Sequence, residues 1–185
     1  LTGTFNRRYL NEVAPTIISQ SENVLVAVID LQDFKGVNDS YGHDFGDRLL
    51  VHVADSIVEA APIGSLVVRL GGDEFVILVE GITGTEWSAK LSHDLATAIS
   101  TPLACPDGAI SQRCNIGIAV SPHDGKTIES LLANADRKMY HAKRAGVANI
   151  ETAHIAEAAP TPTQSLVADI VHGLDHHQFI PYYQP

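Results

Sequence analysis

The stretch VVRLGGDEFVIL, residues 67–78, decides the fold of this chain because it places a Gly-Gly pair between two apolar runs. Apolar, β-branched runs on both sides of such a pair are typical of a β-hairpin. Glycine adopts positive φ easily and has no Cβ, so the turn can be tight and a ligand can approach its backbone. We predict strands at 65–70 and 74–80, with Asp73 and Glu74 at the turn. Considered alone, a turn of this kind is more often a plain solvated connection than a site.

Helix and strand patterns alternate on both sides of this hairpin. The run NVLVAVID, residues 23–30, is almost continuously apolar, which predicts a strand buried on both faces. Apolar residues at helical spacing predict three helices, at 46–61, 85–100 (capped by Thr85) and 128–146. Two more strands are predicted, at 111–122 (where Gly117 marks a close backbone approach) and near 148–151. This order predicts an α/β (α+β) fold with helices packed on a mixed, largely antiparallel sheet.

Composition limits the classes of function. The chain has 185 residues, a hydrophobic content of 45% and a net charge of -10. The negative charge disfavours nucleic-acid binding, which depends on Lys and Arg, but leaves room for a nucleotide bound through a divalent cation. The two cysteines, Cys105 and Cys114, form no disulfide framework and are expected to be reduced thiols. No apolar run is long enough to span a membrane. We therefore expect a cytoplasmic piece, without membrane contact of its own, of a longer protein that other segments could tether to a membrane.

A third acid, Asp30, ends the apolar strand at 23–30. If that strand neighbours the hairpin, Asp30 approaches Asp73 and Glu74. Three like charges in a small space repel one another, and a hard divalent cation relieves the repulsion. Mg²⁺ commonly takes one or two carboxylates and completes its shell with water and phosphate oxygens. The alternative is that Asp30 only caps the loop that follows.

The connection DLQDFKGVNDSYGHDFGD, residues 30–47, combines glycines and acids with a Lys, an Asn and a His. Such a loop can present backbone N–H groups to phosphates at the start of the next helix. The Asn38 amide and the Asp47 carboxylate could pair with the edge of a guanine. The alternative is a polar loop in which Asp44 or Asp47 caps the helix.

These segments, from Leu1 to Ile150, resemble the GGDEF family of diguanylate cyclases. LTGTFNRRYL at 1–10, NIGIAV at 115–120 and ADRKMYHAKRAG at 135–146 match further motifs of that family in the same order. The resemblance implies a central five-stranded sheet wrapped by helices, related to nucleotidyl cyclase and polymerase palm domains. It also implies a reaction in which two GTP molecules, one on each of two facing domains, condense to cyclic di-GMP and release pyrophosphate. The domain would then act as a transient homodimer.

The resemblance also implies a role for each matching residue. Asp30 and Asp73 would bind Mg²⁺ or Mn²⁺, with the Leu31 carbonyl as a further ligand. Asp73 would also be the general base, Glu74 a second acid of the metal site, and Lys143 the contact to the γ-phosphate. Residues at the nucleotide would be Asp33, Phe34 and Lys35 near the phosphates, Asn38 and Asp47 at guanine, and His43, Arg69 and Gly72 around the site.

Three positions depart from the family pattern. Gln32 stands where the family often has Asp, and we expect little loss of metal affinity because Asp30 remains. Val147 replaces an Arg that contacts phosphate, and the loss of one charge-assisted contact costs about 1.5–3 kcal/mol. Pro62 and Ser65 occupy the positions of an RxxD inhibitory motif, so we predict no product inhibition through that site.

The tail LVADIVHGLDHHQFIPYYQP, residues 166–185, resembles the first helix and strand of an EAL phosphodiesterase domain. We predict a GGDEF domain at 1–152, a linker at 153–164 and the start of an EAL domain at 165–185. The intact protein would be a GGDEF–EAL tandem, and this chain would not hydrolyse cyclic di-GMP. Two alternatives remain open: a GTP-binding regulatory module for the EAL neighbour, and an interaction domain without GTP affinity.

Overall fold

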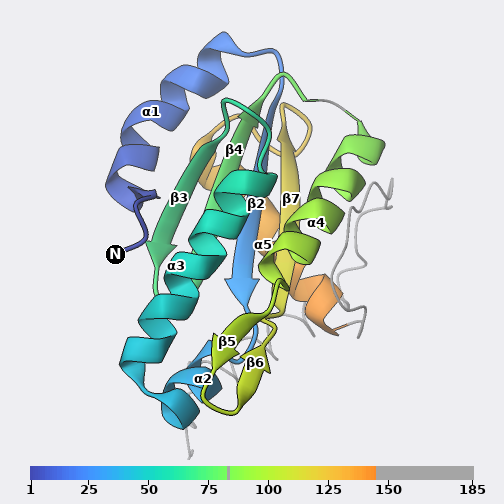
Figure 1. Ribbon diagram of the computed structural model, residues 1–185. Helices are drawn as coiled ribbons and strands as arrows, with labels where there is room; N and C mark the ends of the chain where they lie inside the picture. Colours follow the sequence, from blue (N-terminus) through green and yellow to red (C-terminus); the bar gives the residue numbers. More distant parts are fainter. Residues whose placement is uncertain (83, 145–185) are drawn as a thin grey trace, which may run out of the picture. The chain divides into compact units, whose positions relative to one another are not determined.

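The structure, a computed structural model, describes residues 1–82 and 84–144 (Figure 1). The strands are β1 (Phe5–Asn6), β2 (Val24–Leu31), β3 (Leu66–Gly71), β4 (Glu74–Glu80), β5 (Leu103–Cys105), β6 (Gly108–Ile110) and β7 (Cys114–Ser121). The helices are α1 (Arg7–Gln20), α2 (Phe34–Tyr41), α3 (His43–Ala60), α4 (Thr85–Ile99) and α5 (Ile128–Arg144). Across these residues, no helix has both the length and the apolarity that crossing a membrane requires. The strand predicted near 148–151, the linker and the EAL-like tail lie outside the described residues.

The sheet has five strands in the order β1-β3-β4-β2-β7. β1 runs parallel to β3, and every other pair of neighbours is antiparallel. This confirms the predicted fold class and the predicted hairpin, which is β3–β4. The β1 strand was not predicted, because its two residues are too short to show a strand pattern. The small β5–β6 hairpin, which forms a separate sheet, was also missed.

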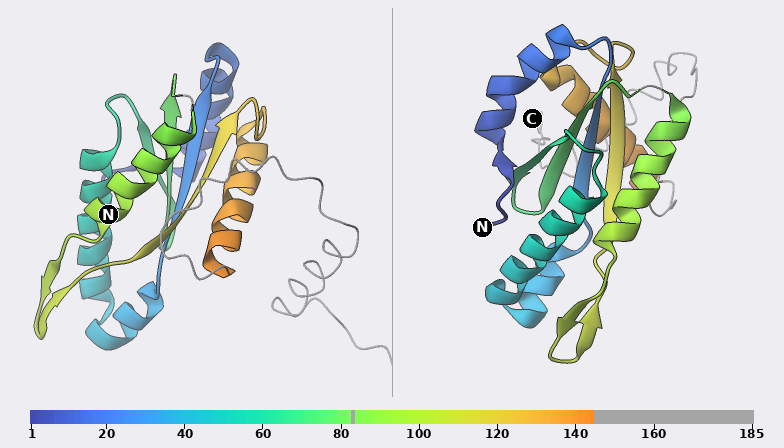
Figure 2. Two further views of the ribbon diagram at one scale, coloured as in Figure 1. Left: turned by 90° about the vertical axis from the view of Figure 1, so that its right-hand side faces the viewer. Right: turned by 45° about the horizontal axis from the view of Figure 1, so that its top comes forward.

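Strand β2 lies at the centre of the fold and is buried on both faces, as predicted. Since side chains alternate along a strand, Leu25, Ala27 and Ile29 pack in one core cluster with residues of α3 and α4. Val24, Val26 and Val28 pack in the other cluster, with residues of α1 and α5. Figure 2 shows these two pairs of helices on opposite sides of the sheet. The sheet is therefore the middle of three layers.

Helix α5 approaches β7 very closely at Gly117. A Cβ atom at this position would lie 2.0 Å from the backbone carbonyl oxygen of Ala135 in α5. The close approach predicted from a glycine inside a strand is therefore confirmed. It brings the backbone of α5 close to the strand that pairs with β2.

The connection at 30–47 differs from the expected loop, because most of it is helical. Phe34, Val37 and Tyr41 share one face of α2 and pack partly against the larger core cluster. Polar residues and glycines between them obscure this pattern in the sequence. Neither Asp44 nor Asp47 caps α3, because the helix begins at His43 with Gly42 at its N-cap and no side-chain cap. Similarly, α4 begins at Thr85 itself, with Gly84 at the N-cap, so Thr85 is not the cap.

Candidate functional site

The C-terminal end of β2 meets the Gly-Gly turn. Asp30 lies directly opposite Glu74 in the antiparallel pairing of β2 with β4. The backbone N–H of Leu31 donates to the carbonyl oxygen of Asp73 at 3.3 Å. Figure 1 shows that β2 ends at the same end of the sheet as the β3–β4 turn, with α2 next to that end. We refer to this end of the strands as the edge that carries the acids. The sequence predicted that Asp30 approaches Asp73 and Glu74 if its strand neighbours the hairpin. The strand β2 does pair with β4, so the three acids lie at the same edge.

The acids at this edge point toward the layer of α1 and α5. Asp30 and Glu74 have the same alternation as Val28 and Val76, which pack in the cluster on that face. From α1, the Arg7 guanidinium lies 3.9 Å from the Glu74 carboxylate, measured from Nη2 to Oε2. Asp30 and Glu74 therefore face the same layer of helices that supplies Arg7.

Asp136, on α5, is a further acid of the site that the sequence did not predict. Partial burial raises the pKa of its carboxyl, and the charge of Asp30 raises it further while Arg7 opposes the shift. One signal in the sequence could have identified Asp136. Asp136 precedes Lys143 by two helical turns within the motif at 135–146, which places both on one side of the helix. The Lys143 side chain itself lies outside the described residues.

The electrostatics of this edge favour a cation. Partial burial raises the pKa of the Glu74 carboxyl, and the negative charges of Asp136, Asp30 and Asp73 add to the shift. Arg7 lowers the Glu74 pKa and offsets part of this repulsion. Carboxylates that raise one another's pKa bind a divalent cation readily, because the cation removes the repulsion.

The acids fit Mg²⁺ bound together with a nucleotide, rather than a metal enclosed by protein ligands. Within residues 1–82 and 84–144, no three His, Cys, Asp or Glu side chains form a ready-made metal cluster. Mg²⁺ does not require one, since it commonly takes one or two carboxylates and fills its shell with water and phosphate oxygens. Asp30 and Asp73, with Glu74 beside them, are hard oxygen donors of this kind.

The Gly-Gly turn is held in place by Arg69. Its Nε and Nη2 both donate to the carbonyl oxygen of Gly72, at 3.0 and 2.7 Å. Gly72 has φ 54°, a left-handed conformation that glycine adopts without strain. The resemblance to the GGDEF family implies that Arg69 and Gly72 lie around the nucleotide site. The structure gives Arg69 a definite contact within the turn, where it fixes the backbone that carries Asp73.

The residues predicted to contact the nucleotide lie on α2 and the start of α3. Asn38 lies against Gly46, where a Cβ atom would be 1.9 Å from the Asn38 Oδ1. This brings Asn38 beside the residue that precedes Asp47, as a shared guanine site requires. Four residues expose their side chains: Asp33, Lys35, His43 and Asp47. Phe34 instead packs partly into the core, so only its backbone remains for a phosphate.

Gln32, the position with a missing acid, takes part in a chain of side-chain hydrogen bonds. Its Nε2 donates to Asn115 Oδ1 at 2.8 Å, and Asn115 Nδ2 donates to Asp30 Oδ2 at 3.3 Å. Cys114, which precedes Asn115 in β7, is buried. Burial together with the charge of Asp30 raises the pKa of its thiol to about 12. This thiol therefore stays protonated at neutral pH, and Cys114 is a free cysteine.

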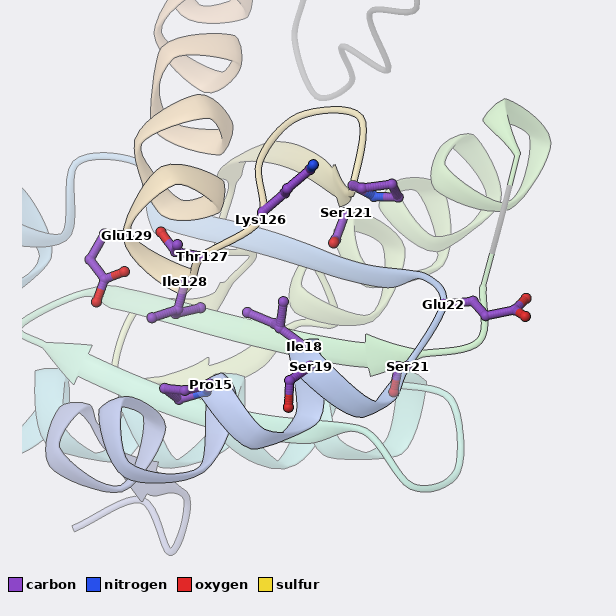
Figure 3. Close-up of a pocket in the computed structure, with 11 residues that line it drawn as sticks. Pro15, Ile18, Ser19, Ser21, Glu22, Ser121, Lys126, Thr127, Ile128 and Glu129 are labelled. Atoms are coloured by element: carbon purple, nitrogen blue, oxygen red, sulfur yellow. The ribbon is translucent and has the colours of Figure 1, made fainter.

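A pocket of about 420 Å³ lies at the opposite end of the sheet (Figure 3). It is bordered by the end of α1, the segment after β7 and the start of α5, and its lining includes Ile18, Ser121 and Lys126. Ser121 pairs with Val24, the first residue of β2, whereas Asp30 lies near the last. None of the described site residues lines this pocket, so the pocket is separate from the acids.

Known proteins share both the sequence pattern and the fold. The family described as "Diguanylate cyclase, GGDEF domain" matches residues 1–149. The chain belongs to this family. The bifunctional diguanylate cyclase/cyclic di-GMP phosphodiesterase MucR of Pseudomonas aeruginosa is 36% identical over 192 residues, which cover 100% of this chain and 28% of MucR.

Two further relatives show the breadth of the family. The cyclic di-GMP phosphodiesterase PdeR of Escherichia coli is 34% identical over 148 residues, covering 79% of this chain and 22% of PdeR. The crystal structure of the GGDEF domain of TpbB from Pseudomonas aeruginosa superposes with a TM-score of 0.74 at 32% identity, covering 80% of this chain and 94% of that one. The chain thus spans about a quarter of the length of the curated relatives, but nearly all of a solved GGDEF domain.

Proposed function

We propose that this chain is a Mg²⁺-dependent diguanylate cyclase domain that condenses two GTP molecules to cyclic di-GMP as a homodimer. The observation that carries the proposal is the pairing of Asp30 with Glu74, reinforced by the Leu31–Asp73 backbone bond. These contacts gather the predicted metal ligands at one edge, next to the helices that hold Asn38 and Asp47. The names of the relatives support the same chemistry, and the match to MucR supports a place within a GGDEF–EAL tandem.

Each residue has a task in the proposed reaction. Asp30, Asp73, Glu74 and the Leu31 carbonyl would hold Mg²⁺, which makes a hydroxyl more acidic and neutralises phosphate charge. Asp73 would accept the proton of the attacking 3′-hydroxyl. That oxygen forms a bond to the α-phosphorus of the second GTP as the α–β phosphoanhydride bond breaks and pyrophosphate leaves. A second, reciprocal step closes the ring.

The homodimer follows from the single guanine position in each proposed site. Asn38 and Asp47 offer one guanine position in each domain, so the second nucleotide must be presented by another copy. Lys35 and the backbone around Asp33 would position the phosphates, and Lys143 would contact the γ-phosphate. Arg69 would keep the turn fixed while the nucleotides meet.

The test is incubation of the chain with GTP and Mg²⁺ at low and high protein concentration, with chromatography for cyclic di-GMP. Product that rises more than linearly with protein concentration supports a cyclase that works as a dimer. Asp73→Asn should lower turnover at least a hundredfold, whereas Asp55→Asn, which changes an exposed acid on α3, should leave it unchanged. Unchanged turnover in Asp73→Asn would refute the assignment of the metal site.

A second candidate is a GTP-binding regulatory module, which the similarity to the phosphodiesterase PdeR favours. It predicts GTP binding without product at any protein concentration. Val147, in place of an Arg, then becomes the first position to change. Val147→Arg should tighten GTP binding at least tenfold, because one charge-assisted contact contributes about 1.5–3 kcal/mol.

A further inference from the structure

Three residues with amide side chains, Gln32, Gln112 and Asn115, lie near Asp30, on the side where β7 pairs with β2. Asn115 is directly opposite Asp30 in the β2–β7 pairing and is only 7% exposed. Gln112 is 3% exposed, and its Nε2 donates to the backbone carbonyl oxygens of Gln32 and Arg113, both at 2.8 Å. The backbone N–H of Gln32 donates to the Arg113 carbonyl at 2.8 Å. The segment that carries Gln32 is therefore fixed to the segment before β7.

The hydrogen bonds in this group have one possible direction. An ionised carboxylate only accepts hydrogen bonds, so Asn115 must turn its NH₂ group toward Asp30. The Asn115 carbonyl oxygen then faces Gln32, which must present its own NH₂ group. The contacts in the structure follow this order, from Gln32 Nε2 to Asn115 Oδ1 and from Asn115 Nδ2 to Asp30 Oδ2. An acid at position 32 could not supply the first donor.

We propose that Asn115 and Gln32 are positioning residues that orient the Asp30 carboxylate for the divalent cation. The inference rests on the proposed metal site and adds two neutral residues to it. Asn115 would hold Oδ2 of Asp30 and so fix the rotation of the carboxylate, and Gln32 would prevent the Asn115 amide from turning over. Outer-shell partners of this kind commonly change metal affinity or activity by 10–100-fold when they are removed.

The burial of Asn115 makes its orientation consequential. A buried amide that turned over would direct its oxygen at a carboxylate, which is repulsive in a partly desolvated position. Gln32 contributes no charge, so its effect on the metal would come through geometry. This accounts for an amide, rather than a further acid, two residues after Asp30.

The test measures Mn²⁺ affinity in the presence of a non-hydrolysable GTP analogue, with free Mn²⁺ followed by electron paramagnetic resonance. Asn115→Ala should weaken Mn²⁺ binding about tenfold, at the low end of the range for outer-shell partners. Gln32→Met, which keeps the length of the side chain and adds no charge, should weaken it severalfold. The control is Gln20→Met, which makes the same replacement at the exposed last residue of α1 and should leave Mn²⁺ affinity near the wild-type value.

A double variant shows whether the two residues act in series. Asn115→Ala with Gln32→Met should bind Mn²⁺ no more weakly than Asn115→Ala alone, because Gln32 acts through Asn115. Additive losses would overturn the proposal and point to two independent structural effects. Equal losses in Gln32→Met and Gln20→Met would also overturn it.

A second readout needs no metal and separates this inference from the proposed function. The side-chain amide signals of Asn115 in the nuclear magnetic resonance spectrum should shift on Gln32→Met and on Asp30→Asn. If the wild type binds no Mn²⁺, the proposed function fails, but shifts in both variants still support the chain of bonds. Asn115 signals unchanged in Gln32→Met would overturn the positioning role whatever the metal result.

Discussion

Two acids, Asp124 just before α5 and Asp136 on it, behave in opposite ways. Asp124, just before the helix, accepts hydrogen bonds from Lys138 Nζ and from the Val120 N–H, both at 2.8 Å. Although partial burial opposes ionisation, these donors, with His123 beside them, lower the Asp124 pKa. Asp136, on the helix, has its pKa raised by partial burial and by the charge of Asp30, although Arg7 opposes the shift.

Asp124 therefore stabilises the fold, whereas Asp136 adds negative charge to a site for a cation. The negative charge of Asp124 is matched by donors, and Asn134 also donates to its backbone carbonyl. This group ties the turn after β7 to α5 and leaves nothing for a ligand to supply. The acids around Asp30 exceed the positive charge that Arg7 provides, so a cation from solution would complete them.

The largest expected effect comes from Gly117→Ala, which disturbs both regions at once. The new Cβ would lie 2.0 Å from the Ala135 carbonyl oxygen, and a backbone atom cannot rotate away. Helix α5 would move off the sheet and take both Lys138 and Asp136 with it. We expect a loss of about 2–3 kcal/mol in the free energy of unfolding, measured by urea titration. A loss below about 0.5 kcal/mol would show that α5 adjusts freely.

The second prediction concerns Asp124 alone. Asp124→Asn should lower the free energy of unfolding by about 1–3 kcal/mol at pH 7, because Lys138 loses its charged partner in a position where Asp124 is only 11% exposed. Because the folded-state pKa of Asp124 is lowered, its contribution is present above the unfolded pKa of about 3.9 and is lost as pH falls through the folded pKa. The basic groups that face Asp124 are His123 and Lys138.

The measurement for Asp124 is the difference in unfolding free energy between the wild type and Asp124→Asn at several pH values. The difference should be constant near neutral pH and shrink below about pH 4, where the wild-type acid also becomes neutral. Asp55→Asn, which changes an exposed acid on α3, serves as the control and should show little difference at any pH. A difference that grows in acid would contradict the structural role of Asp124.

The third prediction, Gly46→Ala, separates binding from folding. The clash here is with the flexible Asn38 side chain, at 1.9 Å from the new Cβ, rather than with backbone. Alanine is favoured over glycine within a helix by up to about 1 kcal/mol, so stability should hold. The displaced Asn38 should weaken GTP binding about tenfold, as measured by calorimetry. Unchanged affinity would remove Asn38 from the guanine site.

The sequence predicted what depends on local pattern. The hairpin, the buried strand at 23–30 and the close approach at Gly117 each follow from periodicity or from glycine. It missed α2, because Phe34 and Val37 stand among polar residues and glycines. It also missed Asp136 and Asn115 as neighbours of Asp30, and Arg7 as a neighbour of Glu74, because strand register and the packing of two helices bring them together across the fold. A lone sequence contains the residues but not these distances.

The smallest expected effect has the opposite sign to that of Asp124. Asp136→Asn removes one charge from the repelling acids while keeping the shape of the side chain. Without metal and at low salt, we expect the free energy of unfolding to rise by a few tenths of a kcal/mol, since the side chain is only partly buried and solvent screens much of the repulsion. Thermal melts with EDTA and with Mg²⁺ measure the difference. Added Mg²⁺ should stabilise the wild type more than the variant, because the cation relieves a repulsion that the variant has already lost. A loss of 1 kcal/mol or more with EDTA would instead make Asp136 a structural acid like Asp124, and the contrast between the two regions would fail.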